Sequence, residues 1–138
     1  MKRVFGDSFF FIALLNVRDF NHGRAREISR RLEGVIFTTQ WVLAEVGNAL
    51  SSLTARKSFA AFLDGLGQQT AVVVLPNSDV LFERGAKLFA SRPDKEWSLT
   101  DCISFEAMRA ERLEEALTGD HHFTQAGFTL LMDPSQLE

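Results

Sequence analysis

Residues 97–123 read WSLTDCISFEAMRAERLEEALTGDHHF, and this stretch carries the change from helix to strand that decides the fold. Its S-L-T-D start has the spacing of a capping box, which predicts a helix over residues 98–112 with Asp101 in the first turn. Residues 115–118 read as a short strand, and the Thr-Gly-Asp turn after it places Asp120 just past the strand's carboxyl end. In an open α/β sheet, that edge is where ligands bind.

Each of these two acids has an ordinary structural interpretation when it is taken alone. A carboxylate in the first turn of a helix is stabilised by the helix dipole, which would be enough to explain Asp101. A Gly-Asp pair after a strand is common turn chemistry, which would explain Asp120. A functional interpretation therefore depends on whether the rest of the chain brings further acids to the same place.

Strands and helices alternate along the rest of the chain. Hydrophobic patterning predicts strands at residues 4–5, 35–38, 70–75 and 128–132, and helices at residues 9–17, 22–32, 40–52, 58–66 and 78–90. The run at 70–75 is the clearest strand, because continuous β-branched content is typical of a strand buried on both faces. Ser8 and Thr39 are expected N-caps, and Gly34 is expected to stop the helix before it.

This order of elements predicts an α/β fold with a mainly parallel central sheet and helices on both faces. Parallel strands bring their carboxyl ends to one edge of the sheet. Asp7, after the first strand, and Asp120, after the next-to-last, are therefore expected to share that edge, while Asp101 leans over it from a helix.

Glu45 is a fourth candidate acid. It lies inside the predicted helix 40–52, and its neighbours at helical spacing include Trp41, Val42 and Ala49, so it projects from a largely apolar face. A carboxylate in such a place is costly unless it is paired, protonated or bound to a metal. A salt bridge to an arginine elsewhere in the chain is the structural alternative.

Four converging carboxylates would repel one another strongly, and a divalent cation resolves that repulsion. Oxygen ligands without an accompanying set of Cys or His favour Mg²⁺ or Mn²⁺ over Zn²⁺, and such ions serve displacement at phosphorus well. The sequence therefore predicts a metal site formed by Asp7, Glu45, Asp101 and Asp120, suited to phosphodiester or phosphoryl chemistry.

The composition fits one globular domain over residues 1–138, since 46% of the residues are hydrophobic and 13 are Phe. The net charge of −3 predicts no broad basic face, so a nucleic acid would have to be held by metal ions or by a local basic strip. The Arg-rich helix 22–32 is more typical of a solvated face than of such a strip.

Cysteine usage and the N-terminus bear on the compartment. The lone Cys102 cannot form an intramolecular disulfide and is expected to pack in the core, which suits a reducing cytoplasm. The apolar run that starts at Phe9 imitates a signal peptide, but Asp7 precedes it and polar residues close it. We interpret it as part of the folded domain, too short to span a membrane.

Three other classes of site fit the sequence less well. A receiver domain needs an Asp that ends the third strand, where this chain has Leu75-Pro-Asn, and an aspartyl phosphatase needs Asp-x-Asp where the chain has Asp7-Ser-Phe. A metal-free nuclease would rely on histidines; His22, His121 and His122 are available, although adjacent histidines after an Asp more often cap a turn.

Four segments together resemble a known family. FGDS around Asp7, TTQWVLAEVGNAL around Glu45, SLTD ending at Asp101 and LTGDHHF around Asp120 are similar, in order and spacing, to the four acidic motifs of PIN domains. The nearest resemblance is to the small VapC-type toxins of prokaryotic toxin-antitoxin pairs, and it covers essentially the whole chain. It implies a three-layer α/β/α fold with four or five strands.

The resemblance further implies a Mg²⁺- or Mn²⁺-dependent endoribonuclease that leaves 5′-phosphate and 3′-hydroxyl ends. Carried over by position, Asp7 and Asp101 become the principal metal ligands, and Glu45 and Asp120 complete the site and help position the attacking hydroxide. The hydroxyl residues beside these motifs would support the ligands or contact the substrate phosphate; they are Ser8, Ser98 and Thr100.

The implied partners are an RNA substrate, an antitoxin protein that lies over the active-site groove, and a second copy of the chain in a homodimer. The apolar helix 9–17 is interpreted mainly as core, with a partner-binding face as the alternative. Two other functions remain open: a PIN nuclease in RNA processing that is not a toxin, and an inactive module that binds RNA or protein.

Overall fold

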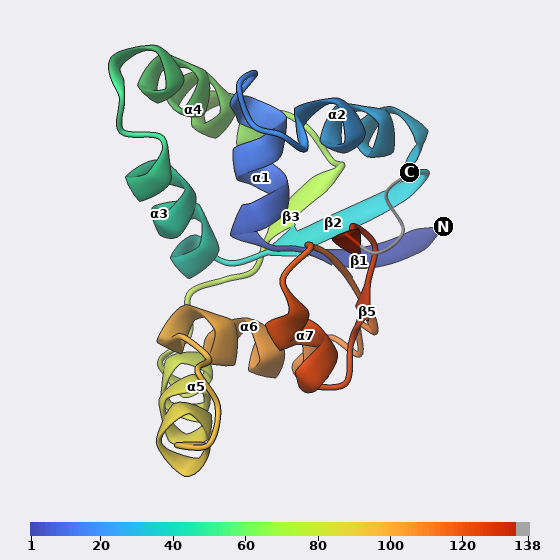
Figure 1. The fold of residues 1–138 in the computed structure, drawn as a ribbon. Coiled ribbons are helices and arrows are strands. Elements are labelled where there is room, and N and C mark those ends of the chain that lie inside the picture. Colours follow the sequence, from blue (N-terminus) through green and yellow to red (C-terminus); the bar gives the residue numbers. More distant parts are fainter. Residues whose placement is uncertain (135–138) are drawn as a thin grey trace.

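The computed structural model describes residues 1–134, which fold around a five-stranded sheet (Figure 1). The strands are β1 (Lys2–Gly6), β2 (Gly34–Thr38), β3 (Val72–Val74), β4 (Glu115–Leu117) and β5 (Thr129–Leu130), in the spatial order β3-β2-β1-β4-β5. Every neighbouring pair is parallel. The predicted α/β fold with a parallel central sheet is therefore confirmed, with five strands.

Seven helices cover the sheet within this part of the chain. They are α1 (Ser8–Leu15), α2 (His22–Arg31), α3 (Gln40–Ala49), α4 (Leu53–Leu66), α5 (Asp79–Ser91), α6 (Leu99–Ala110) and α7 (His121–Gln125). Figure 1 shows α1, α2 and α4 on one face of the sheet and α5, α6 and α7 on the other, so the helices form the two outer layers. The predicted three-layer arrangement is confirmed.

The prediction for the third strand was wrong in extent and in burial. The predicted strand at 70–75 is only Val72–Val74, it pairs with β2 alone, and Val73 at its centre is 37% exposed. A continuous β-branched run is typical of a doubly covered strand, but this one forms an edge of the sheet. The β-branched composition of this segment therefore predicts that it forms a strand. It does not predict whether the strand lies in the interior or at the edge of the sheet.

Several predicted boundaries were also wrong. Asp7, not Ser8, occupies the N-cap position of α1, and it makes no side-chain cap hydrogen bond. Gly34 does not stop α2, which ends at Arg31; Gly34 begins β2, where a Cβ atom would lie 2.1 Å from the Lys2 carbonyl oxygen. α4 begins five residues before the predicted position 58. The Thr39 N-cap of α3 is confirmed by its hydrogen bond from the Val42 amide.

The core fixes the helices that carry the acidic motifs. Phe10 and Phe11 are completely buried, so α1 is a core helix as expected. Under α6, the Phe105 ring meets the Trp97 and Phe123 rings edge-on at centroid distances of 5.1 and 4.9 Å. These aromatic contacts pack the start of α6 and the short α7 against each other, which sets the relative positions of Asp101 and Asp120.

α5 and α6 approach one another closely at Gly85. A Cβ atom at this position would lie 2.8 Å from the Ile103 Cα atom, so only glycine permits the contact.

Among the described residues, no helix combines the length and the apolar composition needed to cross a bilayer.

Candidate active site

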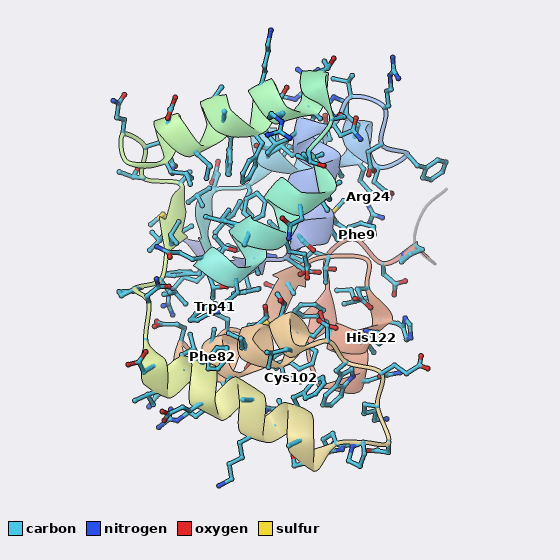
Figure 2. The ribbon with its side chains drawn as sticks, turned by 90° about the vertical axis from the view of Figure 1, so that its left-hand side faces the viewer. Phe9, Arg24, Trp41, Phe82, Cys102 and His122 are labelled. Atoms are coloured by element: carbon cyan, nitrogen blue, oxygen red, sulfur yellow. The ribbon has the colours of Figure 1, made fainter. Side chains whose placement is uncertain are left out.

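The carboxyl edge of the sheet brings the four predicted acids to one region. Asp7 follows β1 and Asp120 follows β4, and these two strands are neighbours. Glu45 lies in the second turn of α3, and Asp101 in the first turn of α6. In Figure 2, α1 and α3 lie above this edge and α6 and α7 below it, with Phe9 and His122 labelled on the two sides. The acids therefore come from four separate elements.

Asp7 is the most buried of the four, with 3% of its surface exposed. The pKa of its carboxyl is raised from the usual 3.8 to about 7, chiefly by burial and to a smaller extent by the nearby charges of Asp101 and Glu45. A hydrogen bond of 2.8 Å from the Thr118 hydroxyl acts in the opposite direction, since it favours the ionised form. The site thus holds a carboxylate where water does not stabilise its charge.

Glu45 is half-buried and accepts a hydrogen bond from the Ser8 hydroxyl, with Oγ and Oε1 2.5 Å apart. The alternative in which an arginine neutralises this carboxylate is therefore wrong: within residues 1–134, Glu45 forms no salt bridge. The hydrogen bond from Ser8 instead fixes the direction of the side chain. This places Ser8 beside an acid of the site, as the sequence predicted.

Asp101 closes a capping box with Ser98. The Ser98 Oγ accepts from the Asp101 amide at 2.9 Å, and Asp101 Oδ2 accepts from the Ser98 amide at 3.1 Å. Burial raises the pKa of Asp101, and the negative charge of Asp120 adds to this effect. Asp101 therefore combines the expected helix-capping role with a position near the other acids.

Asp120 is the N-cap residue of α7. Its Oδ1 accepts from the His122 amide at 2.9 Å, while its own amide donates to the Thr118 hydroxyl oxygen at 3.1 Å. Thr118 thus contacts both Asp7 and Asp120 and is itself completely buried. Thr118 was not among the predicted site residues; the available signal in the sequence was a β-branched hydroxyl residue at a strand end, two positions before a candidate ligand.

His122 was also missed as part of the site. Its Nδ1 lies 3.2 Å from Asp101 Oδ2 and 3.4 Å from Asp120 Oδ1, so one imidazole contacts carboxylates of two different elements. The two adjacent histidines were expected to cap a turn, whereas they lie in the first turn of α7. A helix of five residues is too short for its periodicity to be recognised.

The remaining candidates are less closely connected. Ser98 supports Asp101 through the capping box, whereas Thr100 is half-buried in the first turn of α6, and its proposed role rests on its position beside Asp101. Cys102 is fully buried, and burial raises the pKa of its thiol to about 11, which agrees with the expected packing role.

The donor set fits a divalent cation. Asp7 and Asp101 are both buried, and each is affected by the charge of another acid of the cluster. Carboxylate oxygens are the ligands that Mg²⁺ and Mn²⁺ prefer, and a cation would compensate the like charges. The four predicted side chains are thus suited to hold such an ion.

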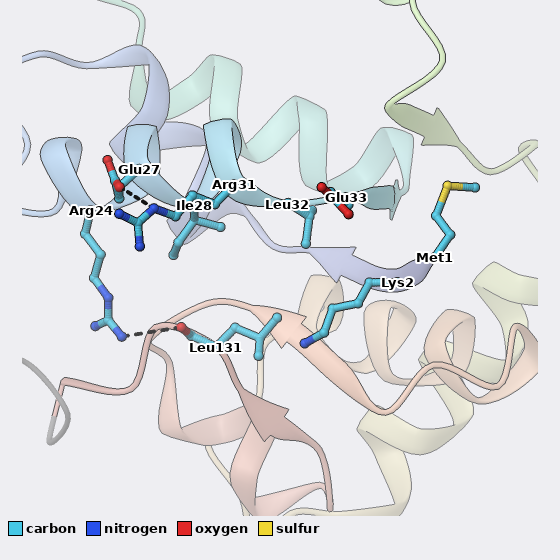
Figure 3. Close-up of a pocket in the computed structure, with 9 residues that line it drawn as sticks. All are labelled: Met1, Lys2, Arg24, Glu27, Ile28, Arg31, Leu32, Glu33 and Leu131. Carbon is cyan, nitrogen blue, oxygen red and sulfur yellow. Dashed lines mark hydrogen bonds and ion pairs between the residues drawn. The ribbon is translucent and has the colours of Figure 1, made fainter.

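A hollow of the described structure lies away from the four acids. It has a volume of about 740 Å³ and is lined by residues of α2 and the first strand together with Leu131, and none of the four acids lines it (Figure 3). Its cations already have partners: Arg31 pairs with Glu27, and Arg24 donates to the Leu131 carbonyl oxygen. This hollow therefore lacks the chemistry found at the carboxyl edge.

Comparison with known proteins identifies the family. Residues 4–129 match the family model of the PIN domain. The chain belongs to the PIN domain family. The resemblance predicted from the four acidic motifs is therefore confirmed, and the described site lies on the scaffold that this PIN domain shares with its relatives.

Two relatives have names that indicate an activity or an assembly. The 23S rRNA-specific endonuclease VapC20 of Mycobacterium tuberculosis is 28% identical over 125 residues, which cover 91% of this chain and 95% of VapC20. The crystal structure of VapC20, a sarcin-ricin loop cleaving toxin, matches this PIN domain with a TM-score of 0.82 at 27% identity, covering 91% of this chain and 96% of VapC20. VapBC2 from Rickettsia felis, crystallised with a DNA fragment from its promoter, matches with a TM-score of 0.65 at 13% identity, covering 94% and 97% of the two chains.

FitAcB from Neisseria gonorrhoeae also has the fold, with a TM-score of 0.62 at 14% identity over 97% of this chain and 99% of its own. At identities this low, the likeness of FitAcB and VapBC2 is one of fold alone. The identity to VapC20 is about twice as high, over nearly the whole of both chains, so this match bears on activity.

Proposed function

We propose that this PIN domain is an endoribonuclease dependent on Mg²⁺ or Mn²⁺, with Asp7, Glu45, Asp101 and Asp120 as its metal-binding acids. The observation that carries the proposal is the burial of Asp7 beside the charges of Asp101 and Glu45. Buried groups of like charge do not stabilise a folded protein, whereas a nuclease needs such carboxylates to bind its metal ion.

The chain's own residues hold the acids in place for this chemistry. Thr118 orients Asp7, Ser8 orients Glu45, and Ser98 fixes Asp101 through the capping box. A bound divalent cation would polarise the phosphoryl oxygens and lower the pKa of a water molecule. Glu45 and Asp120 are more exposed than Asp7 and would help to position that water for in-line attack, leaving 5′-phosphate and 3′-hydroxyl ends.

The proposed substrate is a looped RNA, and the VapC20 match favours the sarcin-ricin loop of 23S rRNA. In the test, purified ribosomes and bulk cellular RNA are incubated with the chain in Mn²⁺ or Mg²⁺, and the cut ends are mapped by primer extension. Cuts that need the metal and disappear with EDTA and with Asp101→Asn are expected. An Asp101→Asn protein that cuts as well as the parent would contradict the site assignment.

We also propose that the chain is the toxin of a toxin-antitoxin pair in the cytoplasm. The support is the VapC20 match. Growth arrest on expression, relieved by co-expression of a small neighbouring gene, is the expected result. An RNA-processing enzyme that is not a toxin would leave growth unaffected while still cutting RNA.

A homodimer is the proposed assembly, because β3 and α5 both carry large apolar side chains that are exposed. They are Val73, Val80, Phe82 and Phe89, between 37% and 55% exposed. Phe82 also stacks on Trp41 of α3 at a centroid distance of 6.1 Å (Figure 2). Light scattering of the purified chain is expected to give twice the chain mass, and Phe89→Glu to give the monomer.

A further inference from the structure

Two imidazoles stand beside the carboxylates at the carboxyl edge. Ligand atoms of Asp120, His121 and His122 all lie within 4.8 Å of one another, a separation that one bound ion can span. The rings of the two histidines have centroids 4.6 Å apart. Asp101, from α6, reaches the same group through its contact with His122. Donors from two separate elements therefore meet at this point.

We propose that Asp120, His121 and His122, with Asp101 beside them, form a mixed nitrogen and oxygen site for a divalent transition-metal ion such as Zn²⁺ or Co²⁺. The inference rests on the proposed function in one respect, because Asp101 and Asp120 are shared with the four-carboxylate site. It goes beyond that function by adding nitrogen ligands, which suit Zn²⁺, Co²⁺ and Ni²⁺ better than Mg²⁺.

The surroundings of the two histidines differ in a way that fits a metal site. The His122 side chain is 20% exposed and held between two carboxylate oxygens, so its ring is already oriented. The His121 side chain is 74% exposed and lies 3.8 Å from Asp120 Oδ1, so it borders solvent. The orientation of the His122 ring is thus fixed before an ion binds, and the His121 ring lies on the side from which an ion can enter from solvent.

A purely structural role for His122 makes a different prediction. In that case its ring only bridges Asp101 and Asp120 by hydrogen bonds, and any side chain with a donor at the Nδ1 position would replace it. His122→Asn provides such a donor without an imidazole, whereas His122→Ala removes both. Comparing the two variants separates ligation from bridging.

The chain contains a matched control. His22, the third histidine, lies at the start of α2, where its Nδ1 is 2.8 Å from the Ala13 carbonyl oxygen. His22→Asn removes one imidazole from the protein but none from the carboxyl edge. A non-specific loss of metal binding on removal of any histidine would therefore appear in this variant as well.

The test measures binding of Zn²⁺ and Co²⁺ to the full chain, freed of any affinity tag, by calorimetry and by the visible absorption of Co²⁺. The His121→Ala/His122→Asn double variant is expected to bind Zn²⁺ at least about 10-fold more weakly and to change the Co²⁺ spectrum. His22→Asn is expected to behave as the parent.

Two results would overturn the inference. One is a double variant whose Zn²⁺ affinity falls by less than about 10-fold. The other is a His122→Asn protein that binds Zn²⁺ as the parent does while His122→Ala does not, since bridging alone would then be sufficient.

The outcome is separable from that of the proposed nuclease. If Asp101→Asn abolishes metal-dependent RNA cutting while the histidine variants bind Zn²⁺ normally, only the transition-metal site is wrong. If Zn²⁺ binding depends on the histidines but no RNA is cut in Mg²⁺ or Mn²⁺, the transition-metal site stands and the nuclease proposal fails.

Discussion

The two edges of the central sheet use charge in opposite ways. At the amino edge, Lys2 pairs with Glu115 and Arg3 with Glu111, and all four side chains are at least one-third exposed. At the carboxyl edge, Asp7 and Asp101 are buried; burial raises the pKa of each, and the charges of other acids in the cluster add to this effect. The amino edge therefore has solvent-exposed pairs of opposite charge, whereas the carboxyl edge has like charges that are buried.

This difference separates residues that serve the fold from residues that serve a site. Exposed ion pairs contribute little to stability, and their loss is tolerated. Buried like charges lower stability, and they persist only where another use outweighs that cost. Four variants, each of which changes one edge and leaves the other intact, are expected to show this difference.

The largest effect is expected for Glu45→Gln. The amide keeps an oxygen for the Ser8 hydroxyl but removes the charge, so RNA cleavage is expected to fall by at least about 1,000-fold, on the scale of losing an essential catalytic group. Glu115→Gln makes the same chemical change at the amino edge and is the matched control. Cleavage rates under single-turnover conditions test this, and equal activities for the two variants would remove the functional distinction between the edges.

Asp7→Asn is expected to change how stability depends on pH in metal-free buffer. Because the folded-state pKa of Asp7 is raised to about 7, folding is favoured at low pH, and that advantage is lost as the pH rises from about 4 through 7. At 1.36 kcal/mol per pKa unit, the loss amounts to roughly 4 kcal/mol. The variant should match the parent at pH 4 and exceed it at pH 8.

Urea unfolding in EDTA at both pH values measures this difference. The amide oxygen can still accept from the Thr118 hydroxyl, so the comparison isolates the charge. A variant whose stability falls with pH as steeply as the parent's would mean that Asp7 is not the group responsible.

Thr118→Val tests whether the hydrogen bonds of the Thr118 hydroxyl with Asp7 and Asp120 stabilise the fold. The change deprives Asp7 of a hydrogen-bond donor and the Asp120 amide of its acceptor, which is expected to cost about 1–3 kcal/mol of unfolding free energy. Thr129→Val, at an exposed strand position, is the control and should stay within about 0.5 kcal/mol. Equal losses in chemical denaturation would show that Thr118 has no special role.

The smallest effect is expected for Lys2→Met at the amino edge. The side chain is 54% exposed, so the ion pair with Glu115 should contribute less than about 1 kcal/mol, and less still in high salt. Thermal unfolding at low and high ionic strength checks this. A larger loss would mean that both edges carry charges on which the fold depends.

The sequence predicted the carboxyl edge better than the sheet around it. Alternating elements and the S-L-T-D box placed Asp101 and Asp120 correctly, because capping and strand-end turns are local in sequence. The position of β3 could not be predicted in the same way, since whether a strand lies at the edge depends on its neighbours in space.

For the same reason, the contacts within the site could not be predicted from the sequence. Thr118 and Asp7 are 111 positions apart, and His122 and Asp101 are 21 positions apart. Nothing in the local pattern of either segment shows that these side chains meet. The acids were identified by type and by family spacing, whereas the residues that hold them required the packed structure.

Asp101 uses one oxygen for two purposes: Oδ2 accepts from the Ser98 amide and also faces His122. An ion drawing on that oxygen would weaken the amide's hydrogen bond, so the magnetic resonance signal and hydrogen-exchange rate of Ser98 should report occupancy of the site. The first turn of α6 would then report whether an ion is bound, even when no substrate is present.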